Sequence, residues 1–315
     1  MKKNCNIVIN NNFCSNVVQE KILHLCKILE KKDLFPDDIT LEQNDFDLKG
    51  NNLIFITLNK NTMNNLRDLM SKINLKTNKI VIVPTSEENY FDFAMEYNLC
   101  NVIHVKRLNE IMLHAILKDF FKKKLNLDSF FTEETNIFDK SYSLSGKISM
   151  HRMVEHLFAD FIKQLHHSIR NTFIINCHEL VTNAMAYGVL GITAYTRDIT
   201  EKDVISYTNI NIPTDKEVQV RLTLNDKRYG ISVKDSGGLL TKQRILERIR
   251  RQSVVGGETI PQGIEDYTGR GLAILSHHGL LIFSIKPNEY TEVSLISRLE
   301  TAIEKKLISI LALDP

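Results

Sequence analysis

The first 125 residues alternate between short apolar runs and longer segments in which apolar residues recur every three or four positions. Runs rich in β-branched residues predict four strands, with a weaker one near 38–41; the four are 6–9, 52–57, 79–83 and 101–105. Segments with helical spacing separate them, at 17–29, 63–73, 90–97 and 108–121. Continuous apolar runs are typical of parallel strands covered on both faces. The alternation therefore predicts βαβ units and a doubly wound parallel α/β sheet.

After residue 148 the pattern changes to longer helices and antiparallel hairpins. Helical spacing covers 149–165 and 168–187, and a basic segment at 239–251 also predicts a helix. Alternating strands joined by turns predict two hairpins, at 218–233 and 280–296. An apolar segment at 299–311 predicts a C-terminal helix, which we expect to pack on its own domain or on a second copy in a homodimer.

Composition agrees with a two-domain chain. A length of 315 residues suggests about two domains, and we place them at 1–125 and 149–315, joined by a connecting segment at 126–148. The formal net charge of +2 argues against a large field for nucleic acid. The 5 cysteines are scattered without a C-x-x-C pair, so we expect a reduced, cytoplasmic protein. Neither a signal-peptide pattern nor a membrane-spanning apolar run is visible.

The ends of the N-terminal strands carry only part of a known site. Counting the weak strand, Thr85 or Ser86 follows the fourth strand, at 79–83, and Lys106 follows the fifth, at 101–105. In these positions, in length and in element order, this half resembles the receiver domain of two-component signalling. Receivers hold magnesium with acidic residues after the first strand, where this chain has Asn10-Asn11-Asn12, and they accept phosphate on an aspartate where it has Thr57-Leu58-Asn59. Neutral amides bind a hard dication less well than carboxylates do.

We therefore interpret residues 1–125 as a degenerate receiver, which docks or senses and does not accept phosphate. A flavodoxin-like domain without any receiver history is the alternative, because open sheets of this kind host many functions.

The second half carries an ordered set of motifs. Glu179 and Asn183 are four residues apart, so they share one helix face. Asp235-Ser-Gly-Gly238 follows a strand, Gly269-Arg-Gly271 opens a helix, and Thr291 lies on a later strand. In this order the motifs resemble the Bergerat ATP-binding fold of the GHKL ATPases, and most of all its anti-sigma-factor serine/threonine kinases, over about 149–299. The resemblance implies an α/β two-layer sandwich with a mixed, mainly antiparallel sheet, and it implies ATP and Mg²⁺ as cofactors.

The resemblance also implies a role for each residue at the base and the metal. Asn183 would ligate Mg²⁺ through its amide oxygen, and Glu179 would orient or deprotonate the attacking hydroxyl. Asp235 would accept a hydrogen bond from the adenine amino group, with Thr291 supporting this contact. Gly237 would let the backbone approach the adenine ring.

At the phosphates, Gly269 and Gly271 would present backbone N–H groups at a helix N-terminus, and Arg270 would add positive charge. The segment 239–268 would form a lid, whose cations belong either to a solvated helix face or to a surface that meets phosphates or a partner: Lys242, Arg244, Arg248, Arg250 and Arg251. The chain departs from the family pattern in two places. Leu239 stands where a glycine is usual, and the stretch 191–213 is longer than the usual connection.

Three functions follow from these motifs. The first is a kinase that phosphorylates a hydroxyl on an antagonist protein and also holds a sigma factor, without contacting DNA or a membrane. The second is a sensor histidine kinase, but His166 and His167 lie too close to Glu179 for a separate dimerisation hairpin. The third is a non-catalytic module in which ATP binding gates a protein contact.

Overall fold

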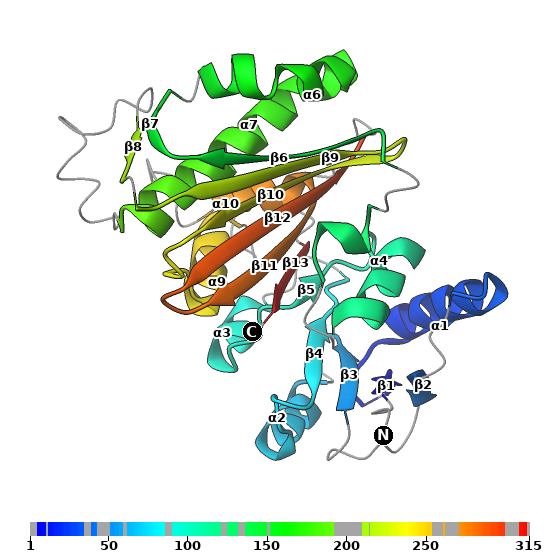
Figure 1. Cartoon of the computed structure of the whole chain (residues 1–315). Helices are drawn as coiled ribbons and strands as arrows, with labels where there is room; N and C mark the ends of the chain where they lie inside the picture. The colour runs from blue at the N-terminus through cyan, green and yellow to red at the C-terminus, as the bar shows by residue number, and fades with distance from the viewer. Residues whose placement is uncertain are drawn as a thin grey trace, which may run out of the picture.

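We describe the fold from a computed structural model of the chain. It describes residues 5–10, 12–34, 39–42, 51–58, 62–85, 90–120, 125–131, 136–149, 152–191, 210–213, 215–253, 261, 271–299 and 309–313. Within these ranges the chain forms an α/β structure around one mixed sheet of 11 strands (Figure 1). The strand order is β2-β1-β3-β4-β5-β13-β11-β12-β10-β9-β6, and a separate sheet pairs β7 with β8.

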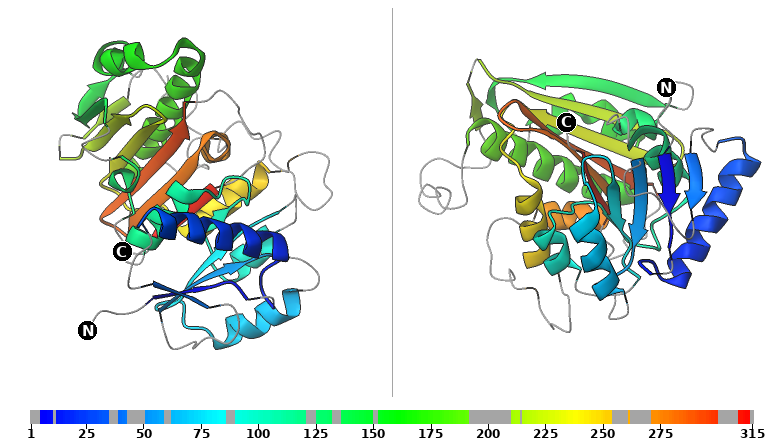
Figure 2. Two further views of the ribbon diagram at one scale, coloured as in Figure 1. Left: turned by 90° about the vertical axis from the view of Figure 1, so that its right-hand side faces the viewer. Right: turned by 90° about the horizontal axis from the view of Figure 1, so that it is seen from below.

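The N-terminal strands are parallel to one another, as the sequence predicts. They are β1 (Cys5–Val8), β2 (Ile39–Glu42), β3 (Asn51–Ile56), β4 (Lys79–Ile82) and β5 (Val102–Ile103). Their helices are α1 (Asn16–Lys31), α2 (Met63–Lys72), α3 (Phe91–Glu96) and α4 (Glu110–Ala115), which continues as the π-helical turn η1 (Ile116–Phe120). Helices α1 and α2 cover opposite faces of these strands (Figure 2), which confirms the doubly wound arrangement.

The strands after residue 136 pair mainly antiparallel. They are β6 (Phe138–Leu144), β9 (Val218–Leu224), β10 (Arg228–Asp235), β11 (Leu280–Lys286) and β12 (Tyr290–Arg298). The small second sheet contains β7 (Gly146–Ile148) and β8 (Ile210–Ile212). Strand β8 lies in the long stretch 191–213, of which residues 192–209 are outside the described ranges.

The helices of this part pack on one face of the sheet, and α6 and α7 lie above β6 and β9 in Figure 1. They are the π-helical η3 (Met153–Leu157), α6 (Ala159–Gln164), α7 (His167–Asn183), the π-helical η4 (Ala184–Val189), α9 (Lys242–Arg251) and α10 (Gly271–His278). The predicted helix over 149–165 is therefore two pieces, which meet at Phe158. This side chain is fully buried and its backbone leaves the helical region, with φ at −102°.

The predicted C-terminal helix over 299–311 is wrong at its C-terminal end. Residues Ser309–Leu313 form the strand β13, and residues 300–308 lie outside the described ranges. Strand β13 is buried along its whole length. It runs parallel to β11 and antiparallel to β5, and the Ala312 N–H donates to Asn101 Oδ1 at 3.0 Å. The C-terminal strand thus joins the two parts of the sheet.

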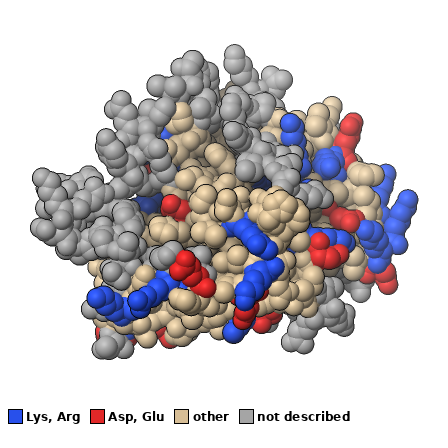
Figure 3. Space-filling view, turned by 90° about the horizontal axis from the view of Figure 1, so that it is seen from above, with Lys and Arg blue, Asp and Glu red and all other residues tan. Residues whose placement is uncertain are grey.

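Two apolar layers cover the two faces of the long sheet. One contains side chains of α2, α3, α7, α9 and α10, and the other contains side chains of α1, α4 and the 3₁₀ turn η2 (Leu127–Ser129). Each layer runs from the N-terminal strands to β11 without interruption. On the face seen in Figure 3, the described acidic and basic side chains are intermixed. None of the described helices is long and apolar enough to cross a membrane.

Candidate functional site

A cavity of about 590 Å³ lies between the helices α7, η4 and α9 and the strands β10 and β12. This volume falls within the usual range for small-molecule sites, about 300–1,000 Å³. Its walls combine apolar and polar side chains, among them Asn183, Tyr187, Val233, Asp235, Arg244, Arg248, Thr291 and Val293. The structure therefore brings three predicted site residues, Asn183, Asp235 and Thr291, to one cavity.

Asp235 is the last residue of β10 and lies directly opposite Thr291 in the antiparallel pair with β12. Only 5% of Asp235 is exposed, and its Oδ1 accepts hydrogen bonds from the backbone N–H groups of Gly237 at 2.9 Å and Gly238 at 3.4 Å. Burial raises the pKa of Asp235, although the N–H groups of Gly237, Gly238 and Thr291 act in the opposite direction. A buried carboxylate with a raised pKa in a cavity wall is typical of a functional residue.

Thr291 is 2% exposed, and its Oγ1 has no hydrogen-bond partner within the described residues. Buried hydroxyl groups without a partner are uncommon in folded proteins. Because Thr291 also lines the cavity beside Asp235, this hydroxyl is a group that a polar ligand would satisfy.

Gly188 explains how η4 comes so close to the carboxylate. A Cβ atom at Gly188 would collide with the carboxylate of Asp235, and one at Gly237 would collide with the Gly188 carbonyl oxygen. Gly188, near the end of η4, is therefore packed directly on the Asp235-Ser-Gly turn. Gly237 has a packing role here, which accompanies its predicted role at the adenine ring.

Glu179 and Asn183 meet the start of α10. A Cβ atom at Gly271 would collide with Glu179 Oε2 and would lie 3.2 Å from Asn183 Nδ2. Glu179 and Asn183 are both half-buried. The structure therefore brings Glu179, Asn183 and Gly271 together, with Asn183 also lining the cavity. The predicted residues Gly269 and Arg270 lie outside the described ranges.

The basic helix α9 forms one side of the cavity. Its apolar side chains Ile245, Leu246 and Ile249 are buried, whereas Arg244 and Arg248 line the cavity. The guanidinium of Arg248 lies 4.6 Å from the centre of the Tyr187 ring. These two arginines therefore belong to the cavity wall, and contact with phosphates or with a partner stays a prediction.

Sequence reasoning assigned no role to Tyr187. The sequence spacing could have identified this residue, because Tyr187 follows Asn183 by four residues and so extends the helix face that carries Glu179.

The ends of the N-terminal strands hold neutral groups that bond locally. The Asn10 side chain accepts from the Asn12 N–H at 2.8 Å, and Thr57 Oγ1 accepts from the Ser15 N–H at 2.7 Å. Lys106 is exposed. In the part of the chain that the structure describes, no group of three or more His, Cys, Asp or Glu side chains is arranged to hold a metal ion. Asn11, Asn59 and Ser86 lie outside that part.

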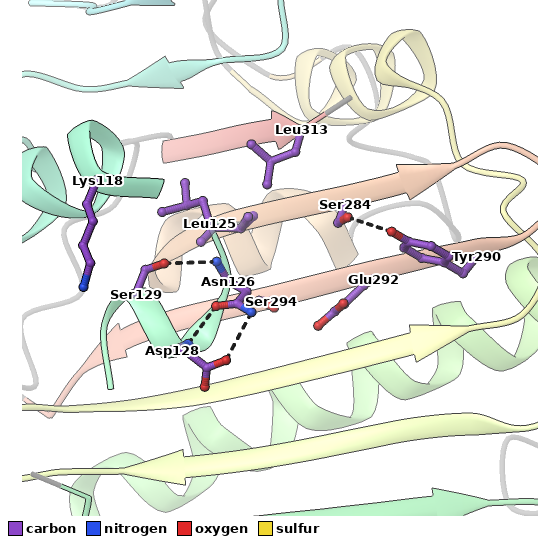
Figure 4. A pocket seen from close by; sticks show the side chains of 11 residues that line it. Lys118, Leu125, Asn126, Asp128, Ser129, Ser284, Tyr290, Glu292, Ser294 and Leu313 are labelled. Carbon is purple, nitrogen blue, oxygen red and sulfur yellow. Dashed lines mark hydrogen bonds between the residues drawn. The ribbon is translucent and has the colours of Figure 1, made fainter. Parts of the chain in front are cut away.

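A second cavity, of about 470 Å³, lies on the other face of the sheet, between η2 and the strands β11, β12 and β13 (Figure 4). Its polar side chains bond mainly to neighbouring protein groups. Ser232 Oγ donates to Glu292 Oε1 at 2.7 Å, and the hydroxyls of Ser284 and Tyr290 are 3.4 Å apart. The first cavity, with its unsatisfied Thr291 hydroxyl, is therefore the better candidate for a ligand site.

A comparison with models of known protein families finds none that matches this chain, and a comparison with curated proteins finds no match either. The geometry of the site and the sequence motifs that form it are therefore the features that indicate a function.

Proposed function

We propose that the chain binds ATP with Mg²⁺ in the cavity beside Asp235 and acts as a protein serine/threonine kinase of the anti-sigma-factor type. In this proposal residues 149–315 form a Bergerat ATP-binding domain, and residues 1–125 form a degenerate receiver that regulates it. One observation carries the proposal. A buried Asp235–Thr291 pair lines a single cavity large enough for a nucleotide together with Asn183, which lies with Glu179 against Gly271.

The Asp235 end has the chemistry to select adenine. An ionised carboxylate only accepts hydrogen bonds, and it would accept one from the exocyclic amino group. The Thr291 hydroxyl, which has no partner within the described residues, would add a second polar contact. The apolar side chains of Val233, Leu240 and Leu272 line the space beside them and suit the faces of a planar base.

The opposite end has the chemistry to hold phosphates and a magnesium ion. The Asn183 amide oxygen would be one neutral ligand of Mg²⁺, which usually keeps phosphate and water oxygens as its other ligands. Gly271 begins α10, so backbone N–H groups and the positive end of the helix dipole lie there. Arg244 and Arg248 supply further positive charge from α9.

Glu179 would then act on the hydroxyl that receives the phosphoryl group. It lies one helical turn before Asn183 and against Gly271, so it is beside the proposed phosphate end. Phosphoryl transfer depends mainly on positioning and on neutralising charge, and a carboxylate at this place would orient the acceptor and take its proton. We expect the acceptor to be a serine or threonine of an antagonist protein that competes with a sigma factor.

The test is phosphoryl transfer from labelled ATP, with Mg²⁺, to purified candidate antagonist proteins. We expect a label on serine or threonine that survives acid. Glu179→Gln should abolish transfer but preserve ATP binding, because it removes the base and keeps the shape against Gly271. Asp160→Ala, which changes an exposed carboxylate on α6, is the matched control and should transfer at the normal rate.

Two results would favour the alternatives. An acid-labile label on His166 or His167 would indicate a histidine kinase, although His167 begins α7 and lies 12 residues before Glu179, about 18 Å along a helix. ATP binding without transfer to any partner would indicate a non-catalytic, ATP-gated module.

A further inference from the structure

Arg107 links the N-terminal part of the chain to the last turn of α10. It lies in the turn that follows β5, and its guanidinium is half-buried. Its Nη1 donates to the carbonyl oxygens of Ser276 at 2.7 Å and Gly279 at 2.9 Å, and its Nη2 donates to that of His277 at 2.5 Å. One side chain therefore binds two carbonyls of the last turn of α10 and the carbonyl of Gly279, which directly follows the helix, about 170 residues later in the sequence.

These contacts suit the physical chemistry of a helix end. The last carbonyls of a helix have no partner within the helix, and a cation is favoured beside them by the helix dipole. Arginine presents several N–H donors in one rigid plane, so it fixes the direction of the helix as well as neutralising its end. Lysine would supply the charge without this geometry.

The other end of the same helix is at the phosphate side of the proposed nucleotide site. Helix α10 has 8 residues and is therefore about 12 Å long. Its first residue, Gly271, already lies in close contact with Glu179 and Asn183. A short helix moves as a rigid body, so displacement at the Arg107 end moves Gly271 against these two side chains.

A second contact ties the Arg107 end to α7. His278 Nδ1 is 2.6 Å from Asn176 Oδ1, and the fully buried Asn176 donates to the Tyr229 hydroxyl at 2.9 Å. Helix α10 is thus held at one end by Arg107 from the N-terminal part and by Asn176 from the helix that carries Glu179. Its position depends on both.

We propose that Arg107 is a positioning residue for the phosphate end of the nucleotide site, acting through α10, and that the N-terminal part regulates the site by this contact. The inference rests on the proposed function. The turn after β5 is suited to this regulation because its neighbour Lys106 is exposed, so a partner or ligand can reach the turn. The adenine end is formed mainly by β10 and β12 and meets α10 at Leu272, so we expect it to depend on Arg107 less than the phosphate end does.

The test compares the binding of ATP and of adenosine to the full chain and to its variants. For Arg107→Ala we expect ATP affinity to fall about tenfold, the scale of a lost charge at a helix end, and adenosine affinity to fall clearly less, because Leu272 is the contact of α10 with the base. Arg107→Lys should give a smaller loss for ATP. Lys106→Ala, at the exposed neighbouring position, is the matched control and should bind both ligands normally.

Hydrogen exchange provides an independent readout. We expect the amides of α10 to exchange faster in Arg107→Ala and in Arg107→Lys than in the control, while the amides of β10 stay protected. If Arg107→Ala does not fold, Arg107→Lys carries both measurements.

The possible results separate this inference from the proposed function. Equal losses for ATP and adenosine, or no loss for either, would overturn the positioning role alone. Failure of the unmodified chain to bind either ligand would overturn the nucleotide site and the inference with it.

Discussion

At the scale of single residues, Asp235 shows a conflict between folding and recognition. Burial raises its pKa, so the folded protein binds this proton more tightly than the unfolded chain does. The associated stability is present at low pH and is lost as the pH rises through the raised pKa. At neutral pH the ionised Asp235 therefore destabilises the fold relative to a neutral side chain of the same shape. This cost is consistent with the binding role that we propose for Asp235.

We predict that Asp235→Asn separates the two effects. The Asn oxygen still accepts from the Gly237 N–H, so the free energy of unfolding in urea should stay the same or increase. ATP affinity should fall about tenfold or more, because an amide N–H would face the adenine amino group and leave a donor unpaired. Calorimetric titration with ATP measures the second effect.

Asp160→Asn, on the exposed surface of α6, is the control and should change neither quantity. Normal ATP affinity in Asp235→Asn would contradict the adenine contact, and a large loss of stability would show that Asp235 has a structural role only.

At the scale of elements, periodicity predicted the helices and hairpins that have one polar face. The same patterns located several residues of the candidate site. Local helix geometry places Glu179 and Asn183 on one face, and Asp235 lies where a predicted strand ends in a turn. Arg107 could not be found in this way, since its partners are carbonyl groups about 170 positions later. The end of the chain was misassigned because β13 is buried throughout, and a short apolar run has no period that separates a strand from a helix.

The end of α10 makes stability depend on pH. The pKa of His277 is lowered from 6.5 to about 4, mainly by burial and further by the positive charges of Arg107 and His278. Burial and the charge of Arg107 also lower the pKa of His278. Between these pH values the unfolded chain binds a proton at His277 that the folded chain does not. We therefore predict that the free energy of unfolding decreases as the pH falls from about 6.5 to about 4, by up to about 3 kcal/mol for His277.

Urea unfolding at a series of pH values measures this effect. His277→Gln should reduce the pH dependence in this window, and His24→Gln, at an exposed position of α1, is the matched control. An unchanged slope in His277→Gln would show that other groups cause the loss.

At the scale of the whole molecule, the sequence indicates two domains, and the structure joins their strands into one sheet. The connection is β13, which pairs with β5 on one side and β11 on the other. Arg107 makes a second connection nearby, through α10. Sequence patterns describe local elements, and neither contact is local, so this arrangement could be seen only in three dimensions. The N-terminal part and the proposed nucleotide site are therefore built on the same sheet.

We predict that a chain truncated after residue 308 loses the cooperative unfolding of the two parts. It lacks Ile310 and Leu311, which are fully buried, and each buried aliphatic side chain contributes about 1.5–3 kcal/mol. It also leaves β5 and β11 as unpaired edges. Differential scanning calorimetry should therefore show the single transition of the full chain divided into two, the first at a lower temperature. Truncation after residue 313 is the matched control and should unfold in one transition.

Asn101→Ala tests the same connection with a smaller change. It removes the acceptor for the Ala312 N–H and the donor to the Ile80 carbonyl, and it leaves buried backbone groups without partners, at a cost of about 1–3 kcal/mol. We expect Asn101→Ala to unfold in one transition that is broader than that of the full chain, because β13 is weakened but still present. A single sharp transition in both the truncated chain and Asn101→Ala would show that the two parts are coupled by Arg107 and the apolar layers without β13.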